Sequence, residues 1–210
     1  MKTQRIPKAT IQRMAIYVQV LEDLQSQEQT VISSDKLAAI CEVNPSQIRK
    51  DLAYFGEFGV RGVGYYVHEL LQAIRHFLGI NRTWHCALVG VGNLGRALLR
   101  HNQLKRKGFK VVAAFDCDPF KIGEVVGGHE VICTRRLKEV AEDKQILIGL
   151  ITTPAKRAQR AANHMVEAGI KGIVNFAPAR IQVPQDIFVD YVDFSNYLIT
   201  LAFNISNRSS

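Results

Sequence analysis

A glycine turn between a short apolar segment and a helix-forming segment constrains this chain most. Gly90, Gly92 and Gly95 fit the pattern G-x-G-x-x-G, directly after the apolar residues 85–89 and at the start of a helical pattern over 94–104. In this pattern the first glycine makes a tight turn, the second lets a pyrophosphate approach the backbone, and the third lets helix and strand pack closely. Free amides at the helix start then face the phosphates. The turn predicts a dinucleotide site formed by Gly90, Val91, Gly92, Asn93, Leu94 and Gly95.

A carboxylate lies where such a site requires one. Asp116 follows the apolar residues 109–115 and comes 21 positions after Gly95. There it would accept hydrogen bonds from the adenosine ribose, and its charge would repel a 2′-phosphate, which favours NAD over NADP. Lys121 can reach the adenosine side, where it opposes this preference. Because ligands bind outside the carboxyl ends of parallel strands, we add Thr152, Thr153 and Pro154 to the predicted NADH/NAD+ site.

The pattern around the turn indicates a whole domain. Apolar segments at 109–115, 145–151 and 172–176 alternate with helical patterns at 136–142 and 155–168. Strands this apolar, separated by helices, are typical of a parallel sheet covered on both faces. We therefore predict a Rossmann-like, doubly wound parallel sheet over residues 81–192.

The first 80 residues follow another pattern. Apolar residues recur at helical spacing over 11–24, Ser34 can cap a second short helix, and Asn44-Pro45 is a strong start for a third. Two short helices joined by a turn are typical of a helix-turn-helix. The glycine-rich ribbon 58–66, with Arg61 near its middle, predicts a β-hairpin wing. Residues 1–80 are therefore predicted to be a winged helix-turn-helix domain, with a three-helix protein-interaction domain as the alternative.

The charge of the chain points to a polyanion but does not locate it. The net charge is +8, yet residues 1–80 carry 9 Lys and Arg against 8 Asp and Glu. The DNA hypothesis therefore depends on positions: Ser, Gln and Arg can reach base edges, while Lys and Arg suit phosphates or the minor groove. The predicted DNA-binding residues are Arg5, Lys8, Arg13, Ser46, Gln47, Arg49, Lys50, Tyr54 and Arg61.

Other classes of site are disfavoured. The four cysteines, 45, 31 and 16 positions apart, have no metal-ligand spacing, so each is expected to be a small buried hydrophobe. No catalytic residue is predicted. The N-terminus lacks the pattern of a secretory signal and no apolar run would span a bilayer, so we expect a cytoplasmic protein without membrane contact.

With both elements in view, the chain resembles the Rex family of redox-sensing transcriptional repressors over almost its whole length. This resemblance implies a homodimer that binds double-stranded operator DNA when NADH is scarce and releases it when NADH binds, with NAD+ competing. It also implies a C-terminal helix exchanged between subunits. The matching segments are 6–10 with Arg13, 46–52, 56–65, 90–95, 115–119, 121–123 and 172–178.

The exchanged helix would lie within residues 193–210. Asp193 is a plausible N-cap, followed by Phe194 and an apolar face of Leu198, Leu201, Ala202 and Ile205. Some relatives carry a tyrosine that pairs with the aspartate at the start of this helix, and His101 stands at the matching position here. We hypothesise that His101 pairs with the partner's Asp193, which would make the coupling between subunits respond to pH.

Two alternatives remain open at this stage. An NAD-dependent dehydrogenase would also use the glycine turn, but only about 20 residues follow the sheet and a substrate domain needs more. A coenzyme A-binding module would suit the sheet with Thr152-Thr153-Pro154, which is similar to the nucleotide-binding domain of acyl-CoA ligases.

Overall fold

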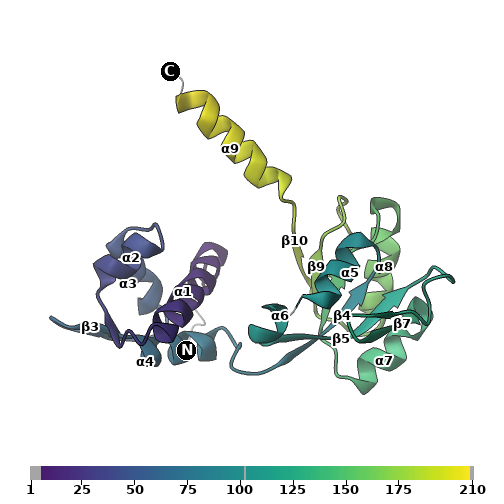
Figure 1. Cartoon of the computed structure of the whole chain (residues 1–210), viewed down its shortest axis with the longest axis horizontal. Helices are drawn as coiled ribbons and strands as arrows, with labels where there is room; N and C mark the ends of the chain where they lie inside the picture. Colours follow the sequence, from purple (N-terminus) through teal and green to yellow (C-terminus); the bar gives the residue numbers. More distant parts are fainter. Residues whose placement is uncertain (1–5, 102, 209–210) are drawn as a thin grey trace. The chain divides into compact units, whose positions relative to one another are not determined.

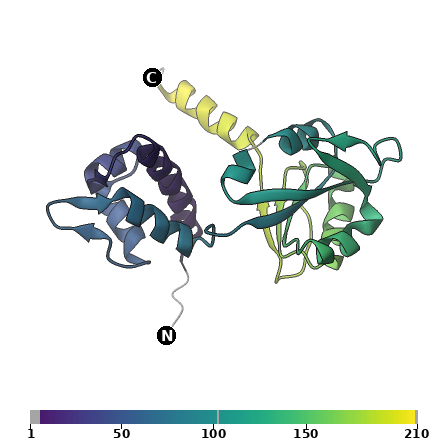
Figure 2. The ribbon, with the colours of Figure 1, turned by 60° about the horizontal axis from the view of Figure 1, so that its bottom comes forward.

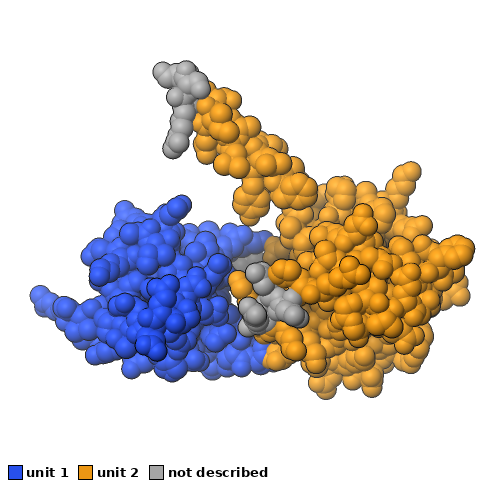
Figure 3. Space-filling view, in the orientation of Figure 1, with its two compact units in different colours: residues 1–82 blue, residues 83–210 orange. Residues whose placement is uncertain are grey.

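A computed structural model describes residues 6–101 and 103–208 of the chain. It divides into two units, Met1–Arg82 and Thr83–Ser210 (Figure 3). Each unit has a hydrophobic core of its own.

The first unit is a helical domain with a small sheet. Its sheet has the order β1-β3-β2, in which β2 and β3 form the hairpin drawn as the blue loop in Figure 2. Strand β1 pairs antiparallel with β3 and was not predicted, because a two-residue strand has no readable periodicity. The elements are α1 (Lys8–Ser26), β1 (Val31–Ile32), α2 (Ser34–Ile40), α3 (Pro45–Ala53), β2 (Gly59–Val60), β3 (Gly64–Tyr66) and α4 (Val67–Phe77).

Capping residues fix the two short helices. The Asn44 side chain accepts a hydrogen bond from the Ser46 amide at 3.0 Å, and Pro45 occupies the first turn of α3, as predicted. For α2 the prediction is wrong by one residue: Ser33 is the cap and accepts from the Lys36 amide at 3.2 Å. Ser33 has the extended backbone that a capping residue needs, whereas Ser34 is already helical.

The second unit alternates strands and helices along the chain (Figure 1). Its elements are β4 (Trp84–Val89), α5 (Asn93–Arg100), α6 (Gln103–Arg106), β5 (Phe109–Asp116), β6 (Val125–Val126), β7 (His129–Cys133), the 3₁₀ turn Thr134–Arg136, α7 (Leu137–Asp143), β8 (Ile148–Ile151), α8 (Ala155–Glu167), β9 (Gly172–Asn175), β10 (Phe188–Tyr191) and α9 (Ser195–Arg208).

The strands form a seven-stranded sheet in the order β10-β9-β8-β4-β5-β7-β6. All neighbours pair in parallel except β6, which is antiparallel to β7 at the edge. From β4 the chain builds outward through β5 and β7, then returns to β8 on the other side of β4. The order therefore reverses between β4 and β8, and a crevice at such a switch point is where doubly wound sheets bind nucleotides.

Both faces of the sheet are covered. Ala87, Val89 and Phe115 pack against helices α7 and α8 in one core cluster. Leu88 and Ala114, which alternate with them along β4 and β5, pack on the opposite side with Leu99 of α5. This confirms the predicted fold class, a winged helix-turn-helix domain followed by a doubly wound α/β sheet.

Two predicted elements are shorter than expected. The strand expected over 145–151 covers only Ile148–Ile151, because Gln145 has a left-handed backbone (φ 51°) as the chain leaves α7. The helix expected over 94–104 is broken at His101, whose backbone is extended. Among the described residues, no helix is long and apolar enough to cross a membrane.

Candidate functional site

The three glycines of the turn each meet a different physical demand. Gly90 has φ +107°, and a Cβ there would lie 2.8 Å from the backbone of Thr152 and Thr153. A Cβ on Gly95 would collide with the Gly90 carbonyl oxygen, so this glycine allows α5 to approach β4. Nothing lies within 4 Å of a Cβ built on Gly92. That open space, beside the first amides of α5, is what a pyrophosphate needs.

Asp116 at the end of β5 stabilises this turn by hydrogen bonds. One carboxylate oxygen accepts from the Val91 amide at 2.8 Å and from Lys121 Nζ at 3.2 Å, and the other from the amides of Cys117 and Asp118. Burial acts to raise the pKa of Asp116, but the hydrogen bonds from the Asp118 and Val91 amides and from Lys121 outweigh it, so the pKa is lowered. The group is therefore an ionised acceptor at neutral pH. Lys121 pairs with Asp116 and also lines the cavity, and its reach to the adenosine stays a prediction.

A cavity of about 610 Å³ opens at the carboxyl ends of β4, β5, β7 and β8. Thr152 donates its hydroxyl proton to the Gly90 carbonyl oxygen at 2.6 Å, which joins the two sides of the switch point. Two buried polar atoms that line the cavity have no hydrogen-bond partner, Thr153 Oγ1 and His164 Nε2. Because buried polar groups are normally paired, these two atoms fit a bound polar ligand.

The structure brings together most of the predicted nucleotide residues, but not all of them face this cavity. Val91 is fully buried, and neither it nor Asn93, Leu94 or Gly95 lines the cavity wall. Sequence reasoning missed several basic residues. For Arg157, Arg160 and His164 the available signal was their spacing on the helix after Pro154, which is equally typical of a solvated face; Arg135, in the 3₁₀ turn after β7, had no such signal. The predicted residues that line the cavity are Gly90, Gly92, Asp116, Lys121, Thr152, Thr153 and Pro154; the missed basic ones are Arg135, Arg157, Arg160 and His164.

In the first unit, a buried carboxylate holds α3, the helix that is predicted to read DNA. Asp51 of α3 is fully buried and receives a two-pronged ion pair from Arg13 of α1, at 2.6 and 2.7 Å. Tyr17, Thr10 and Gln47 also donate to this carboxylate, at 2.8, 3.2 and 2.9 Å. Burial acts to raise the pKa of Asp51, and the hydrogen bonds from Arg13, Tyr17 and Gln47 lower it further than burial raises it.

This network gives two of the predicted DNA-binding residues a structural role. Arg13 donates to Asp51 from Nε and Nη2, and Gln47 donates from Nε2. A guanidinium that left this buried carboxylate to bind a phosphate would leave the carboxylate charge unpaired. Both side chains therefore help to fix α3 against α1, and their contact with DNA stays a prediction.

The other predicted DNA residues remain on the surface. Arg49 and Arg61 line one hollow of about 480 Å³ between α3 and the hairpin, where Arg49 also donates to the Ser34 hydroxyl at 3.2 Å. Lys50 and Tyr54 are exposed, and Ser46 is half-buried at the start of α3. Lys8 is exposed in the first turn of α1, and Arg5 lies outside the described residues. The helix and the hairpin thus present one cationic surface.

The residues predicted to couple the subunits lie on exposed parts of the second unit. His101 is exposed at the end of α5. Asp193 accepts from the Ser195 amide at 2.9 Å, but α9 begins at Ser195 and its first backbone bond goes to the carbonyl of Phe194, so Asp193 precedes the N-cap position by one residue; Phe194 is 75% exposed. Residues 193–207 are exposed throughout, including Leu198, Leu201 and Ile205. The pairing of His101 with the partner's Asp193 stays a prediction.

Metal ligation finds no support in the part of the chain that the structure describes, which contains no cluster of His, Cys, Asp and Glu suited to an ion. Cys41 and Cys86 are buried, which raises the pKa of each thiol to about 11. Cys117 is exposed, contrary to the expectation, because it follows the strand end at the cavity.

Comparisons with known proteins agree with this division. Residues 5–53 match a family described as "Putative DNA-binding protein N-terminus", and residues 81–179 match one described as "CoA binding domain". The chain is 65% identical over 207 residues to the redox-sensing transcriptional repressor Rex of Maridesulfovibrio salexigens, covering 99% of both chains. It is 61% identical to that of Solidesulfovibrio magneticus, covering 98% of this chain and 94% of the relative.

Solved structures give the same result. The chain is similar to RSP, a Rex-family repressor, in complex with β-NAD+ and operator DNA, with a TM-score of 0.90, 33% identity, and coverage of 97% of this chain and 94% of that one. For RSP in complex with β-NADH the TM-score is 0.89 at 32% identity, with 98% and 97% covered. By sequence identity over its full length and by its fold, the chain belongs to the Rex family of redox-sensing transcriptional repressors.

Proposed function

We propose that this chain is a transcriptional repressor that binds operator DNA as a homodimer and releases it when NADH binds, with NAD+ as the competing ligand. One observation carries the proposal. A dinucleotide cavity at the switch point of the sheet and a cationic helix-and-hairpin surface belong to the same chain. Relatives described as redox-sensing repressors match both units. A repressor acts where the DNA is, so we place its action in the cytoplasm.

The residues present fit the cofactor. The open face of Gly92 and the first amides of α5 would receive the pyrophosphate, and Arg157 and Arg160 carry positive charge toward the same cavity. We expect the Asp116 carboxylate to accept hydrogen bonds from the adenosine ribose. Because its oxygens already accept from Val91 and Lys121, we propose that a ribose hydroxyl takes the place of the Lys121 ammonium. In this proposal the protein responds to the redox state of the NAD(H) that it binds, and its residues hold the cofactor without catalysing a reaction on it.

Release of DNA demands that NADH distinguish two shapes of the dimer. A ligand that binds both shapes equally shifts nothing, and a change from 1:99 to 99:1 needs about 5.5 kcal/mol of differential affinity. The exposed apolar side chains of α9 support a contact with a second copy, since such surface is costly to leave in water. We propose that α9 is exchanged between subunits and makes the contacts that differ between the two shapes.

The test is an operator-release titration. The probe is a fluorescent, two-fold symmetric duplex that the full chain has selected from random-sequence DNA, followed by anisotropy. NADH should weaken duplex binding, while NAD+ alone should not and should compete with NADH. The Asp116→Ala variant should keep its DNA affinity without cofactor and lose the NADH response. Equal duplex affinity with and without saturating NADH would refute the proposed function.

A second candidate is favoured by one specific observation, the match of residues 81–179 to the "CoA binding domain" description. If coenzyme A were the ligand, it should displace NADH from the cavity in a fluorescence competition. We expect no displacement at concentrations at which NAD+ competes. A dehydrogenase activity is not expected, because the relatives are named as repressors.

A further inference from the structure

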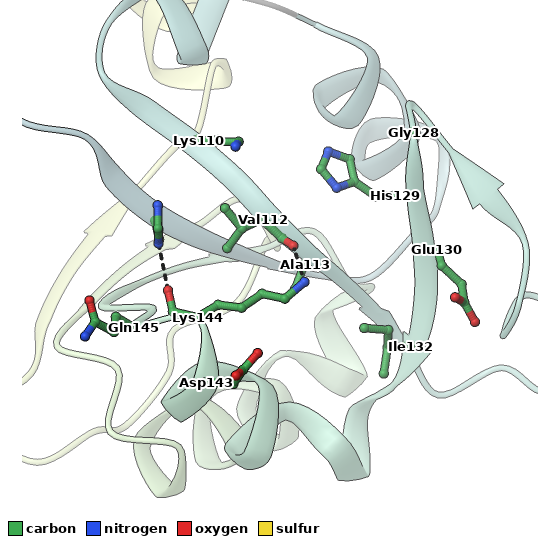
Figure 4. Close-up of a pocket in the computed structure, with 11 residues that line it drawn as sticks. Lys110, Val112, Ala113, Gly128, His129, Glu130, Ile132, Asp143, Lys144 and Gln145 are labelled. Carbon is green, nitrogen blue, oxygen red and sulfur yellow. Dashed lines mark hydrogen bonds between the residues drawn. The ribbon is translucent and has the colours of Figure 1, made fainter.

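A second cavity lies at the other end of the strands of the same sheet. Its volume, about 610 Å³, equals that of the nucleotide cavity. It opens where β4, β5 and β7 begin, beside the end of α7, whereas the nucleotide cavity lies where these strands end. Figure 4 labels most of the residues around it, which are Lys110, Val112, Ala113, Gly128, His129, Glu130, Ile132, Asp143, Lys144 and Gln145; His85 also lines the cavity.

A β-bulge shapes the floor of this cavity. Cys86 of β4 pairs with Val111, but the next residue, Ala87, pairs with Ala113, so Val112 is an extra residue on β5. On the other side of β5, pairing with β7 begins only at Ala114. The Val112 carbonyl oxygen instead accepts from Lys144 Nζ at 3.2 Å. Bulges of this kind disrupt the ladder and re-aim side chains, and they are frequent beside functional sites.

Both the side chain and the backbone carbonyl of Lys144 are hydrogen-bonded. Its ammonium reaches across the cavity to Val112, as Figure 4 shows, and its carbonyl oxygen lies 2.7 Å from Nδ1 of His85. A carbonyl oxygen only accepts, so His85 Nδ1 is the donor, and this fixes the tautomer of the neutral ring. Gln145, with φ 51°, then turns the chain away. The ammonium is thus placed before any ligand arrives, which lowers the entropic cost of binding.

Two lysines act on the half-buried ring of His129. The pKa of His129 is lowered by burial and then by the charges of Lys144 and Lys110. The carboxylates of Glu130 and Asp143 also line the cavity and are exposed, as both lysines are, but only the lysines act on His129. An anion that pairs with the lysines would offset the effect of their charges on this ring.

We propose that this cavity is a second ligand site, for a small organic anion whose carboxylate or phosphate group pairs with Lys110 and Lys144 over the apolar floor of Val112 and Ile132. The volume is in the range of small-molecule sites. A dinucleotide is not the ligand here. The turn that lines it, at Gly128, joins the two strands β6 and β7 and leads into no helix, so the glycine turn and helix N-terminus that hold a pyrophosphate are missing among the lining residues.

The test uses the full chain saturated with NADH, so that the nucleotide cavity cannot take up the probe. Inorganic phosphate and succinate are titrated separately at constant ionic strength, with uncharged succinamide as the control probe. The readouts are the NMR signals of the His129 ring and of the Gly128 amide. We expect one or both anions to shift these signals with a dissociation constant of about 1 mM or tighter, and to raise the pKa of His129. Which anion acts identifies the group as phosphate or carboxylate.

Three variants separate the site from general charge effects. Lys110→Gln and Lys144→Gln should each weaken anion binding by about tenfold or more. Lys138→Gln, which removes an exposed lysine of α7 outside the cavity, should bind like the parent chain. The proposal is overturned if neither anion shifts the His129 and Gly128 signals, if succinamide shifts them as well as succinate does, or if Lys110→Gln binds the anions as tightly as Lys138→Gln.

Discussion

At the scale of single residues, Asp51 determines the hydrogen bonding of the side chains around it. Four side chains from two helices donate to this buried carboxylate, including both prongs of Arg13. Burying a carboxylate is tolerable only when it is paired and hydrogen-bonded. Arg13 therefore helps to hold α3, although in the sequence it is simply one more cation near the N-terminus. No local pattern reveals a pair that is 38 positions apart.

The Asp51 network predicts a pH-dependent stability. Its folded pKa lies below the unfolded value of about 3.9, so the stabilisation is present at neutral pH and is lost as pH falls from about 4 through the folded pKa. Asp51→Asn should lower the free energy of unfolding by about 3 kcal/mol at pH 7, and the difference from the parent should shrink in acid. Urea unfolding measures both. Asp186→Asn, in an exposed ion pair with Lys171, is the control and should cost about 1 kcal/mol or less. A loss for Asp51→Asn that is no larger than the control's would contradict this assignment.

Arg49 and Lys50 are expected to act on DNA itself. Arg49→Ala or Lys50→Ala should weaken operator binding by about tenfold or more, because each removes a base or phosphate contact from the exposed side of α3. NADH affinity and thermal stability should not change. Anisotropy and NADH fluorescence measure these effects, with Lys138→Ala as a charge-matched control on the second unit. Operator affinity equal to that of the control would place the DNA-reading surface elsewhere.

At the scale of elements, the sequence predicts those helices and strands that are long enough to show a periodic apolar pattern. The glycine turn, the strands β4 and β5, and the helices α3 and α8 are close to expectation, because apolar periodicity and caps specify them locally. Strands β1 and β6 are only two residues long and exist through pairing alone. The broken helix at His101 was missed because no proline or glycine lies between Arg96 and Leu104 to mark the break. The candidate sites follow the same rule: Asp116 and Thr152 were found from strand ends, but Lys121 as a partner of Asp116 and the cations of α8 depend on tertiary contacts.

The glycine turn gives a prediction that separates folding from binding. Gly90→Ala should destabilise the second unit by about 2 kcal/mol or more, because φ +107° and the Thr152 backbone both exclude a side chain. Gly92→Ala should unfold like the parent, since its φ of −89° suits any residue and the added methyl meets open space. NADH affinity should nevertheless fall in Gly92→Ala, where the methyl occupies the approach of the pyrophosphate. Thermal melts measure the stability of each variant, and NADH fluorescence measures its cofactor affinity. A Gly92→Ala variant with parental NADH affinity would contradict the placement of the phosphates.

Helix α9 carries the prediction about assembly. The paired change Leu198→Asp and Leu201→Asp places charges on its exposed apolar face and should convert the dimer to a monomer or weaken it by at least about tenfold. Asn196→Asp and Asn204→Asp together add the same charge at polar positions of the helix and serve as the control. Analytical ultracentrifugation measures the equilibrium. A paired leucine variant that dimerises as well as the control would exclude α9 from the subunit contact.

At the scale of the whole molecule, the account depends on linkage between two separate sites. The net charge of +8 did not locate the DNA surface, since residues 1–80 are nearly neutral and Arg13 is paired with Asp51. What supports a switch is the presence of both sites on one chain together with the exposed apolar face of α9. If NADH weakens operator binding by some factor, operator must weaken NADH binding by the same factor.

The most direct test is therefore the affinity of the full chain for NADH, measured by fluorescence once without DNA and once with the selected operator duplex at saturation. The account predicts weaker NADH binding on the duplex, by the same factor by which saturating NADH lowers duplex affinity in the anisotropy titration. A scrambled duplex should leave the NADH affinity unchanged. An NADH affinity that is identical with and without operator would contradict the account, because it would mean that binding at one site does not change the affinity of the other.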